Sequence, residues 1–357
     1  MKPRLRYLFL ALAACLVLGG CGSKKNYKYR IAVIPKGLTH EHWQSVHRGA
    51  DRAAEDLEKE GIAVEILWDG PIRENEATEQ IRLVRQMVNE GANGLVLAPQ
   101  HSKQMVDPVE KARARGVPTV IIDSNLDRDT LKENPDLIVK YIATNNYNGG
   151  RLAAKHLLEV LDAEKHNEHN LVLLRYDVGS ESTEQREQGF LDYLAEQRKK
   201  GKTINLLSDD QYARATVEEA QRVAGPLLRS LEGQRLDGIF AVNESSTTGL
   251  LNALRAQKKT GKVHVMGFDS SKPLLQALRD NEVDGLVIQD PYRMGYLGVW
   301  TLVQHLEGYD VSAGGKDLST GEFVVTKKNM DDPEIREKFD PEYQEKRTVQ
   351  KPKYAKK

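Results

Sequence analysis

Residues 31–68 read IAVIPKGLTHEHWQSVHRGADRAAEDLEKEGIAVEILW, and this stretch decides the fold. An apolar run at 31–34 is followed by an amphipathic stretch at 43–59 and by a second apolar run at 64–68. Near-continuous Val/Ile/Leu runs are typical of parallel strands buried on both faces, and the stretch between them has helical spacing. The segment is therefore predicted to form a strand, a helix and a parallel strand, joined by a right-handed crossover.

The same alternation continues along most of the chain. Further strand-like runs lie at 94–98, 119–122, 139–143, 171–174, 204–207, 238–242, 263–267 and 285–288. Helical patterns between them lie at 76–89, 147–161, 182–198, 216–231 and 292–306. These strands are more than one open sheet of this size usually carries. We therefore predict an α/β fold with two similar doubly wound sheets, with the break near 143–146.

The end of the sequence is different in composition. After residue 307 the alternation loosens, apart from a short strand-like run at 322–326. Residues 327–357 are charged and contain few large apolar side chains. A segment of this composition buries little apolar surface, so it is predicted to pack weakly or to be disordered.

The first 21 residues have the pattern of a lipoprotein signal. A basic start precedes an apolar stretch at 8–18, and residues 18–21 read LGGC. We expect residues 1–20 to be a signal peptide, Cys21 to carry the lipid anchor and residues 21–29 to be a tether. The alternatives are a plain signal peptide with a chance cysteine, or a transmembrane anchor. The apolar run is far shorter than the roughly 20 residues that a spanning helix needs.

Composition excludes several classes of function. Beyond Cys21 there is no other cysteine, which excludes disulfides, a cysteine nucleophile and a cysteine-based metal site. Cleavage before Cys21 removes three basic residues and no acidic one, so the 52 basic and 52 acidic residues leave a formal charge of −3. That balance is unlike a nucleic-acid-binding surface. The mean hydropathy of −0.55 fits a soluble body whose membrane contact is left to the lipid.

Polar side chains follow the predicted strands at the point where each strand ends. They are Lys36, Asp123, Arg175, Tyr176, Asp209, Asp210, Asn243, Asp269, Gln289 and Asp290. Ligands of doubly wound sheets bind beyond the carboxyl ends of the strands, and Asp, Asn and Gln offer paired groups suited to vicinal hydroxyls. A shared ligand cleft is the favoured interpretation. The alternative is that these residues only cap helices, as Asp269 could.

Residues 39–43 (THEHW) form the other dense polar segment. His42 and Trp43 are candidates for ligand contact, because an aromatic ring at a cleft edge can stack on the apolar face of a sugar. Capping or packing is the alternative. A zinc site is disfavoured because the spacing is not H-E-x-x-H.

The enzyme motifs that we considered are incomplete or absent in this sequence. Residues 201–203 (GKT) resemble the end of a phosphate loop, but Glu196 stands where that motif needs glycine. There is no G-x-S-x-G elbow, and no G-x-G-x-x-G follows the first strand. The carboxylates are spread over both halves rather than set as one flanking pair, which disfavours a glycosidase. We expect no catalytic residue, no metal and no cofactor.

The sequence resembles the ribose-type periplasmic binding proteins, the solute receptors of bacterial ABC sugar importers, from about Arg30 to Thr326. The motifs that carry the resemblance are IAVI at 31–34, VIID at 120–123, TNNYNGG at 144–150, STEQREQGF at 182–190, FAVNE at 240–244 and VMGFD at 265–269. The resemblance implies two Rossmann-like lobes joined by a three-segment hinge, which is the type I periplasmic binding protein fold. It implies an N-terminal lobe of residues 30–143 plus 290–316 and a C-terminal lobe of 144–289 plus 317–326.

The resemblance also implies a ligand set. Family positions match in type at Asp123, Asn243, Asp269 and Gln289, with Trp43 at a stacking position and Tyr212 near another. The lactose-repressor group shares the core, but no helix-turn-helix precedes it here.

The sequence departs from the ribose pattern in several places. His40 to Trp43 replace Asn-Pro-Phe-Phe, Ser124 follows Asp123 where arginine is common, and Glu184 falls where the second lobe usually has a ligand-holding arginine. Lys36 replaces a small polar residue, and Arg175 could restore a cation to the second lobe. Lys36 and Glu184 could latch the closed cleft, or Lys36 could hold an acidic group of the ligand.

The implied function is that of a lipid-anchored solute-binding protein of the cell envelope. It would capture a sugar or polyol-like ligand by hinge closure and deliver it to an ABC permease, as a monomer. The alternative is an input protein that presents the same ligand to a membrane kinase or chemoreceptor. An extracytoplasmic hydrolase on this scaffold would instead need turnover of a bound glycoside.

Overall fold

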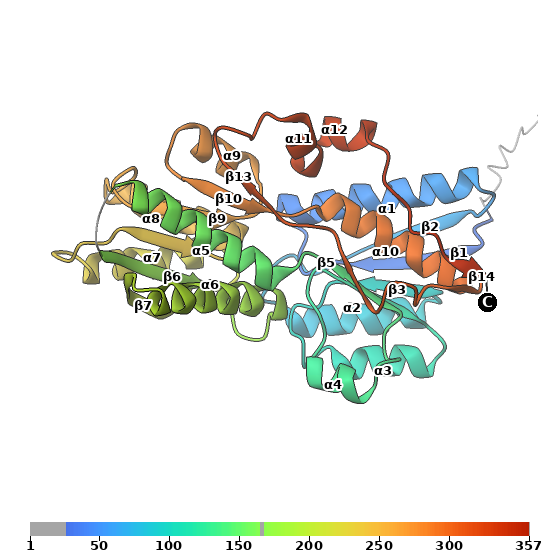
Figure 1. The fold of residues 1–357 in the computed structure, drawn as a ribbon. Helices are drawn as coiled ribbons and strands as arrows, with labels where there is room; N and C mark the ends of the chain where they lie inside the picture. Colours follow the sequence, from blue (N-terminus) through green and yellow to red (C-terminus); the bar gives the residue numbers. More distant parts are fainter. Residues whose placement is uncertain (1–25, 165–167, 357) are drawn as a thin grey trace, which may run out of the picture.

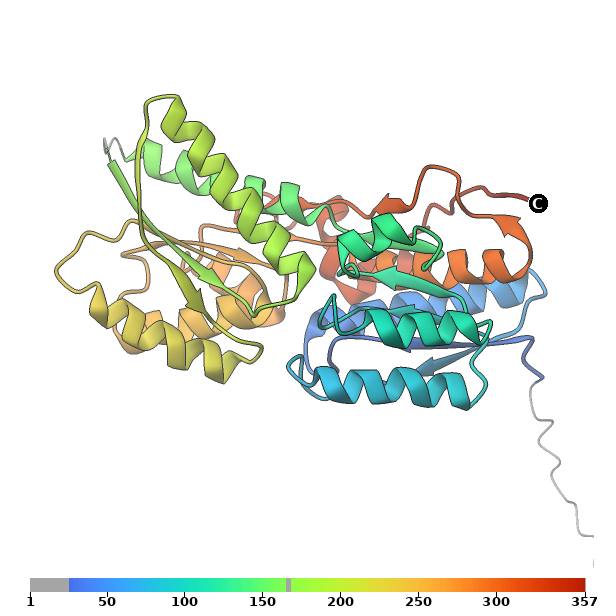
Figure 2. The same cartoon turned by 90° about the horizontal axis from the view of Figure 1, so that it is seen from below.

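The computed structural model describes residues 26–164 and 168–356, so the predicted signal peptide and Cys21 lie outside the described residues. The chain forms two lobes that lie side by side (Figures 1 and 2). Each lobe is built on a six-stranded sheet with helices on both faces. The predicted α/β fold of two doubly wound lobes is confirmed.

The first sheet has the order β12-β5-β4-β3-β1-β2, with all neighbours parallel. Its strands are β1 (Tyr29–Ile34), β2 (Val64–Trp68), β3 (Gly94–Leu97), β4 (Thr119–Ile122), β5 (Lys140–Ala143) and β12 (Asp317–Ser319). The helices of this lobe are α1 (Glu41–Lys59), α2 (Ala77–Asn89), α3 (Val106–Ala114), α4 (Arg128–Glu133) and α10 (Pro291–Leu306). Alternate residues of β1 face two cores, one under α1 and α10 and one under α2 and α3, as strands buried on both faces require.

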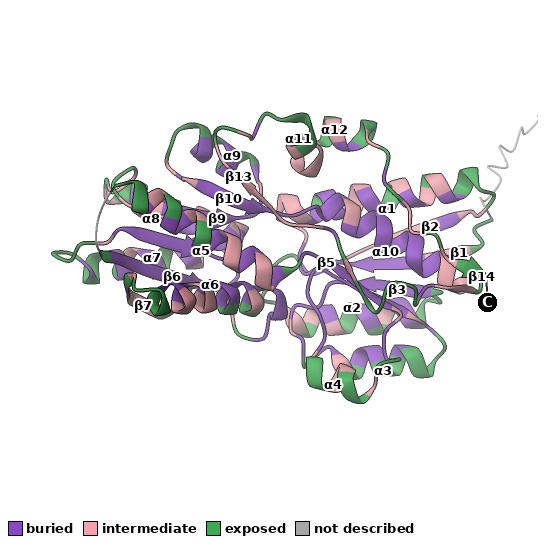
Figure 3. Cartoon of the chain, viewed as in Figure 1, coloured by how far each residue is buried: buried purple, intermediate pink, exposed green. Residues whose placement is uncertain are grey.

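The second sheet repeats this plan in the order β13-β10-β9-β8-β6-β7, with only β13 antiparallel to its neighbour. Its strands are β6 (Glu168–Arg175), β7 (Thr203–Tyr212), β8 (Gly238–Ala241), β9 (His264–Phe268), β10 (Gly285–Ile288) and β13 (Phe323–Val325). The helices are α5 (Asn146–Ala163), α6 (Glu181–Lys199), α7 (Val217–Ser230), α8 (Glu244–Ala256) and α9 (Lys272–Arg279). The inner strands β6, β8, β9 and β10 are mostly buried, whereas the edge strand β7 is largely part-exposed and the outer helix faces are exposed (Figure 3).

One pair of helices in each lobe approaches at glycines. A Cβ atom on Gly49 of α1 would lie 1.9 Å from the Tyr292 carbonyl oxygen of α10, and one on Gly295 would lie 2.0 Å from that of Val46. Gly150 and Gly189 make the same approach between α5 and α6, at 1.9 and 2.0 Å. No larger residue fits at these positions, so glycine sets the helix spacing on the corresponding face of both sheets.

The chain passes between the lobes after β5, after β10 and between β12 and β13. The expected boundary at residues 316 and 317 differs from this structure, because β12 pairs in parallel with β5 of the first sheet and Leu318 packs against the first-lobe core. The sequence of β12 is DLS, which is too short and polar to show a strand pattern. The last passage therefore lies at about 320–322.

The segment 327–356, which we name the C-terminal strap, packs against both lobes, contrary to the expected weak packing or disorder. It contains α11 (Pro333–Phe339), α12 (Pro341–Lys346) and β14 (Ala355–Lys356), and it runs over the junction of the lobes (Figure 1). Met330, Ile335 and Phe339 pack on the second-lobe core, and Val349 joins the first. β14 pairs with β11 (Tyr309–Asp310).

A buried ion pair anchors the strap to the start of α10. Arg347 lies 2.9 Å from Asp290, and both side chains are at most 6% exposed. This buried ion pair and the few apolar contacts hold the strap, and composition alone does not reveal contacts of this kind. Within the described residues, no helix is long and apolar enough to cross a bilayer.

Candidate functional site

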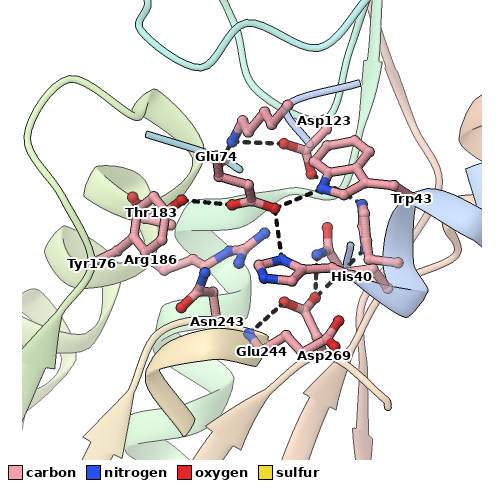
Figure 4. A pocket seen from close by; sticks show the side chains of 14 residues that line it. His40, Trp43, Glu74, Asp123, Tyr176, Thr183, Arg186, Asn243, Glu244 and Asp269 are labelled. Carbon is pink, nitrogen blue, oxygen red and sulfur yellow. Dashed lines mark hydrogen bonds and ion pairs between the residues drawn. The ribbon is translucent and has the colours of Figure 1, made fainter. Parts of the chain in front are cut away.

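A polar cavity lies where the carboxyl ends of the two sets of strands face each other. It is lined by Lys36, His40, His42, Trp43, Glu74, Asp123, Tyr176, Ser182, Thr183, Arg186, Asn243, Glu244, Asp269 and Gln289 (Figure 4). Its volume is about 20 Å³, little more than one water molecule needs. A sugar ring therefore requires these side chains to move or the lobes to separate.

The lobes are closed on one another around this cavity. Lys36 of the first lobe donates to the hydroxyls of Ser180 and Ser182 of the second lobe, at 3.2 and 3.0 Å. Arg128 of the first lobe pairs with Glu181 of the second at 2.6 Å. These contacts join the loop after β1 and the first residue of α4 to the start of α6.

Asp123 and Lys36 form a buried pair on the first-lobe side. Lys36 Nζ lies 2.9 Å from Asp123 Oδ2, and both side chains are 5% exposed. Burial opposes ionisation of Asp123, but the Lys36 ammonium and His42 hold its pKa well below the usual range. Asp123 has φ of 62°, in the left-handed region, and Asp269 has φ of 71° at the matching position of the second lobe. Both lobes thus turn an aspartate into the cavity directly after a strand.

Glu74, on the loop between β2 and α2, is contacted by three polar side chains (Figure 4). Trp43 Nε1 donates to it at 2.6 Å, Tyr176 of the second lobe donates its hydroxyl at 2.6 Å, and His40 Nδ1 pairs with it at 2.7 Å. Burial opposes the charge, but His40, Lys36 and Tyr176 lower the pKa of Glu74 to about 2. Burial lowers the pKa of His40, but the charge and the hydrogen bond of Glu74 outweigh burial and raise the pKa of His40 to about 9. The pair is therefore fully ionised at neutral pH.

His42 lies between the two aspartates. Its Nε2 is 3.4 Å from Asp123 and its Nδ1 is 3.8 Å from Asp269. Burial lowers its pKa, but the hydrogen bond and charge of Asp123 and the charge of Asp269 produce a net rise. His42 therefore lines the cavity, and its contact with a ligand stays a prediction.

On the second-lobe side, the cavity is lined by residues that follow the strands β8, β9 and β10. Asn243 caps α8 by accepting from Ser246 N at 3.0 Å. Asp269 accepts from Gln289 Nε2 at 2.5 Å and from Glu244 N at 3.0 Å. Asn243 therefore both caps α8 and lines the cavity, two roles that the sequence left as alternatives.

Arg186 and Glu244 complete this side. Arg186 donates to Asn146 Oδ1 at 2.8 Å and to Val242 O at 3.0 Å, and its guanidinium lies 3.8 Å from the Phe268 ring centre. Burial raises the pKa of Glu244 to about 7 although His40 lowers it, and its Oε2 has no hydrogen-bond partner among the described residues.

Seven of the ten predicted contacts line the cavity: Lys36, His42, Trp43, Asp123, Asn243, Asp269 and Gln289. Three do not. Arg175 pairs instead with Glu187 at 2.6 Å. Glu184 is exposed and accepts a hydrogen bond from Gly179 N at 2.7 Å. Tyr212 is 38% exposed and lies beside Arg175. The latch between Lys36 and Glu184 is not formed.

The second lobe presents an arginine to the cavity at Arg186, although Glu184 stands at the position where the ribose pattern has one. Arg186 lies two residues beyond Glu184, which is roughly 200° around the helix. Glu184 is therefore exposed, whereas Arg186 lines the cavity. His40, Glu74, Tyr176, Ser182, Thr183 and Glu244 also line the cavity but were not among the predicted contacts. Tyr176 had a signal at its strand end, whereas Glu74 lies in a charged loop with no pattern.

Among the described residues, no group of three or more His, Cys, Asp or Glu side chains is placed to hold a metal ion. The two lobes close over a cavity that both of them line with polar groups. This arrangement is typical of a protein that encloses a small polar ligand. Comparison with known proteins agrees. Residues 31–310 match the family model described as periplasmic binding protein domain, and the chain belongs to this family.

Several similar proteins are binding proteins for sugars. The D-ribose/D-allose-binding protein of Pseudomonas aeruginosa is 27% identical over 302 residues, covering 84% of this chain and 90% of that protein. A carbohydrate transporter solute-binding protein of Agrobacterium radiobacter, solved with D-arabinose, is 31% identical with a TM-score of 0.77, over 87% of this chain and 99% of that one. An ABC transporter solute-binding protein of Agrobacterium vitis with bound D-fucose is also 31% identical, with a TM-score of 0.76, over 86% and 98%.

The predicted resemblance to ribose-type periplasmic binding proteins is confirmed. These relatives are solute-binding proteins of sugar importers and not enzymes, and the family implies an extracytoplasmic location.

Proposed function

We propose that this protein is a lipid-anchored solute-binding protein that captures a sugar or polyol-like ligand by closing its lobes and delivers it to an ABC importer. The observation that carries the proposal is the cavity itself. Asp123, Asn243, Asp269 and Gln289 bring paired acceptors and donors from both lobes to one point. Such planar groups suit vicinal hydroxyls, and closure surrounds the ligand from two sides.

The surroundings of Lys36 favour a neutral ring in this cavity. The ammonium already contacts Asp123, Ser180 and Ser182 within 3.2 Å. An acidic group placed here would have to compete with Asp123, which lies 2.9 Å from the Lys36 ammonium. Of the two roles considered for Lys36, holding an acidic group of the ligand is therefore disfavoured. Instead, Lys36 joins the lobes through the serines.

A thermal-shift screen of sugars and polyols tests the ligand class. A ligand at 100 times its Kd should stabilise the protein by about 2.7 kcal/mol. We expect pentoses, hexoses or polyols to raise the melting temperature and amino acids, such as leucine and glutamate, to leave it unchanged. Stabilisation by an amino acid with none by any sugar or polyol would contradict the proposal.

Lipid attachment is tested at Cys21, which lies outside the described residues. In a diderm host, we expect Cys21→Ser to leave the membrane fraction and to stop incorporating labelled palmitate, because the sulfur that carries the diacylglycerol is gone. Cys15→Ser, within the apolar stretch, is the matched control and should stay in the membrane. Retention of the Cys21→Ser protein would show that a different segment holds it there.

A further inference from the structure

A second cavity lies beside the first, on the side covered by the C-terminal strap. We name it the strap chamber. His42, Asp269 and Gln289 line both spaces, while Phe339 and Pro341 of the strap lie over the chamber. Its volume is about 290 Å³, against about 20 Å³ for the main cavity. A ring held in the main cavity would therefore have one edge against a larger space.

Three cations from separate elements line the strap chamber: Arg48 on α1, Lys272 on α9 and Lys338 on α11. The acidic side chains of its lining are Glu41 and Asp269. Both are engaged, since Glu41 accepts from Lys272 N at 3.3 Å and Asp269 binds Gln289 and Glu244 N. The lining therefore carries an excess of positive charge.

These cations are poorly compensated within the protein. Lys338 Nζ is 3.8 Å from Asp290 and 3.9 Å from Glu337, and Asp290 is held more closely by Arg347. Within the described residues, Lys272 Nζ has no carboxylate oxygen within 4.0 Å. Arg48 donates through Nη2 to Gln344 at 2.9 Å, while its buried Nε has no partner there. This contrasts with Lys36, whose contacts are filled.

We propose that the strap chamber receives an anionic substituent of the ligand, a phosphate, sulfate or carboxylate carried by the sugar whose ring occupies the main cavity. This inference rests on the proposed function. The ring would lie against His42, Asp269 and Gln289, and a substituent on that edge would reach toward Lys338 and Lys272. Charge-assisted hydrogen bonds to these cations are stronger than those between neutral groups.

Calorimetry with matched sugars tests the proposal. The probes are D-ribose with D-ribose 5-phosphate, D-allose with D-allose 6-phosphate, and inorganic phosphate alone. We expect at least one ester to bind about tenfold or more tightly than its neutral parent, because hydrogen bonds to charged groups are the stronger ones. In Lys272→Met/Lys338→Met that advantage should disappear, with the affinity for the neutral parent unchanged. Raising the salt concentration should reduce the advantage in the unchanged protein.

The control is Lys262→Met/Lys353→Met, which removes the same charge from exposed sites away from the chamber and should keep the full advantage. Esters that bind no more tightly than their parents, or an advantage that survives in Lys272→Met/Lys338→Met, would overturn the proposal. So would inorganic phosphate binding as tightly as the ester, since the chamber would then be a free-anion site. If neutral sugars bind and only the ester result fails, the proposed function stands without this inference. If no sugar binds, both fail.

Discussion

An Asp123→Asn variant is expected to bind its sugar ligand at least about 30-fold more weakly than the unchanged protein, since truncating a buried charged contact costs about 2–5 kcal/mol. Asparagine is the appropriate replacement because Asp123 has φ of 62°, a conformation that asparagine tolerates and alanine does not. The substitution removes the charge that holds Lys36 and His42 while keeping the shape of the side chain. Calorimetric affinity for the best sugar of the screen measures the loss.

Asp127→Asn is the matched control for this variant. Asp127 caps α4 by accepting from Thr130 N at 3.1 Å and lies outside the cavity, and asparagine caps helices equally well. Its affinity should be unchanged. If Asp123→Asn keeps full affinity while losing thermal stability, Asp123 serves the loop and not the ligand.

Replacing Glu74 by alanine is expected to lower the free energy of unfolding by about 3–5 kcal/mol, the cost of leaving one partner of a buried ion pair alone. The side chains of Glu74 and His40 are only 7% and 13% exposed. Without Glu74, the His40 cation, the Trp43 indole and the Tyr176 hydroxyl lose their shared acceptor. Chemical denaturation at pH 6 measures the loss.

The pair also predicts a pH dependence. The pKa of His40 is raised to about 9, so its contribution is fully present below about 6.5 and is lost as the pH rises through 9. The pKa of Glu74 is lowered to about 2, so its contribution is present above about 4.5 and is lost as the pH falls through 2. The stability difference between the unchanged protein and Glu74→Gln should therefore be largest between about pH 4.5 and 6.5 and should shrink towards pH 9.

Glu79→Ala provides the comparison, because Glu79 lies on the surface of α2 with its side chain 41% exposed. Its loss should change the free energy of unfolding far less than the loss of Glu74, because an exposed ion pair adds little to stability. An equal effect of the two alanine variants, or a Glu74→Gln difference that does not change between pH 6 and 9, would show that the pair is not a buried charge pair in solution.

The order of strands and helices could be predicted from the sequence because each buried strand is a near-continuous apolar run. Where strands lack that pattern, prediction failed. β12 reads DLS and gains its place only by pairing with β5, and the strap is held by scattered contacts such as Arg347 to Asp290. Contacts between residues far apart in sequence leave no periodic trace.

The site could be predicted where topology alone places a residue. Asp123, Asn243, Asp269 and Gln289 each follow a strand, so the fold brings them together without knowledge of any loop. Glu74 comes instead from an irregular loop, whose path is decided by packing. Arg186 was not predicted as a contact, because its place at the cavity depends on which face of α6 is buried.

The interleaving of the two lobes also has a consequence for biogenesis. β12 and β13 are the edge strands that complete the two sheets, and both lie late in the chain. Neither sheet is finished until residues 317–325 have been made, and the pair of Asp290 and Arg347 forms only after that. Contacts over such sequence separations form slowly. A chain built this way is therefore expected to reach its native state only after both edge strands have been made.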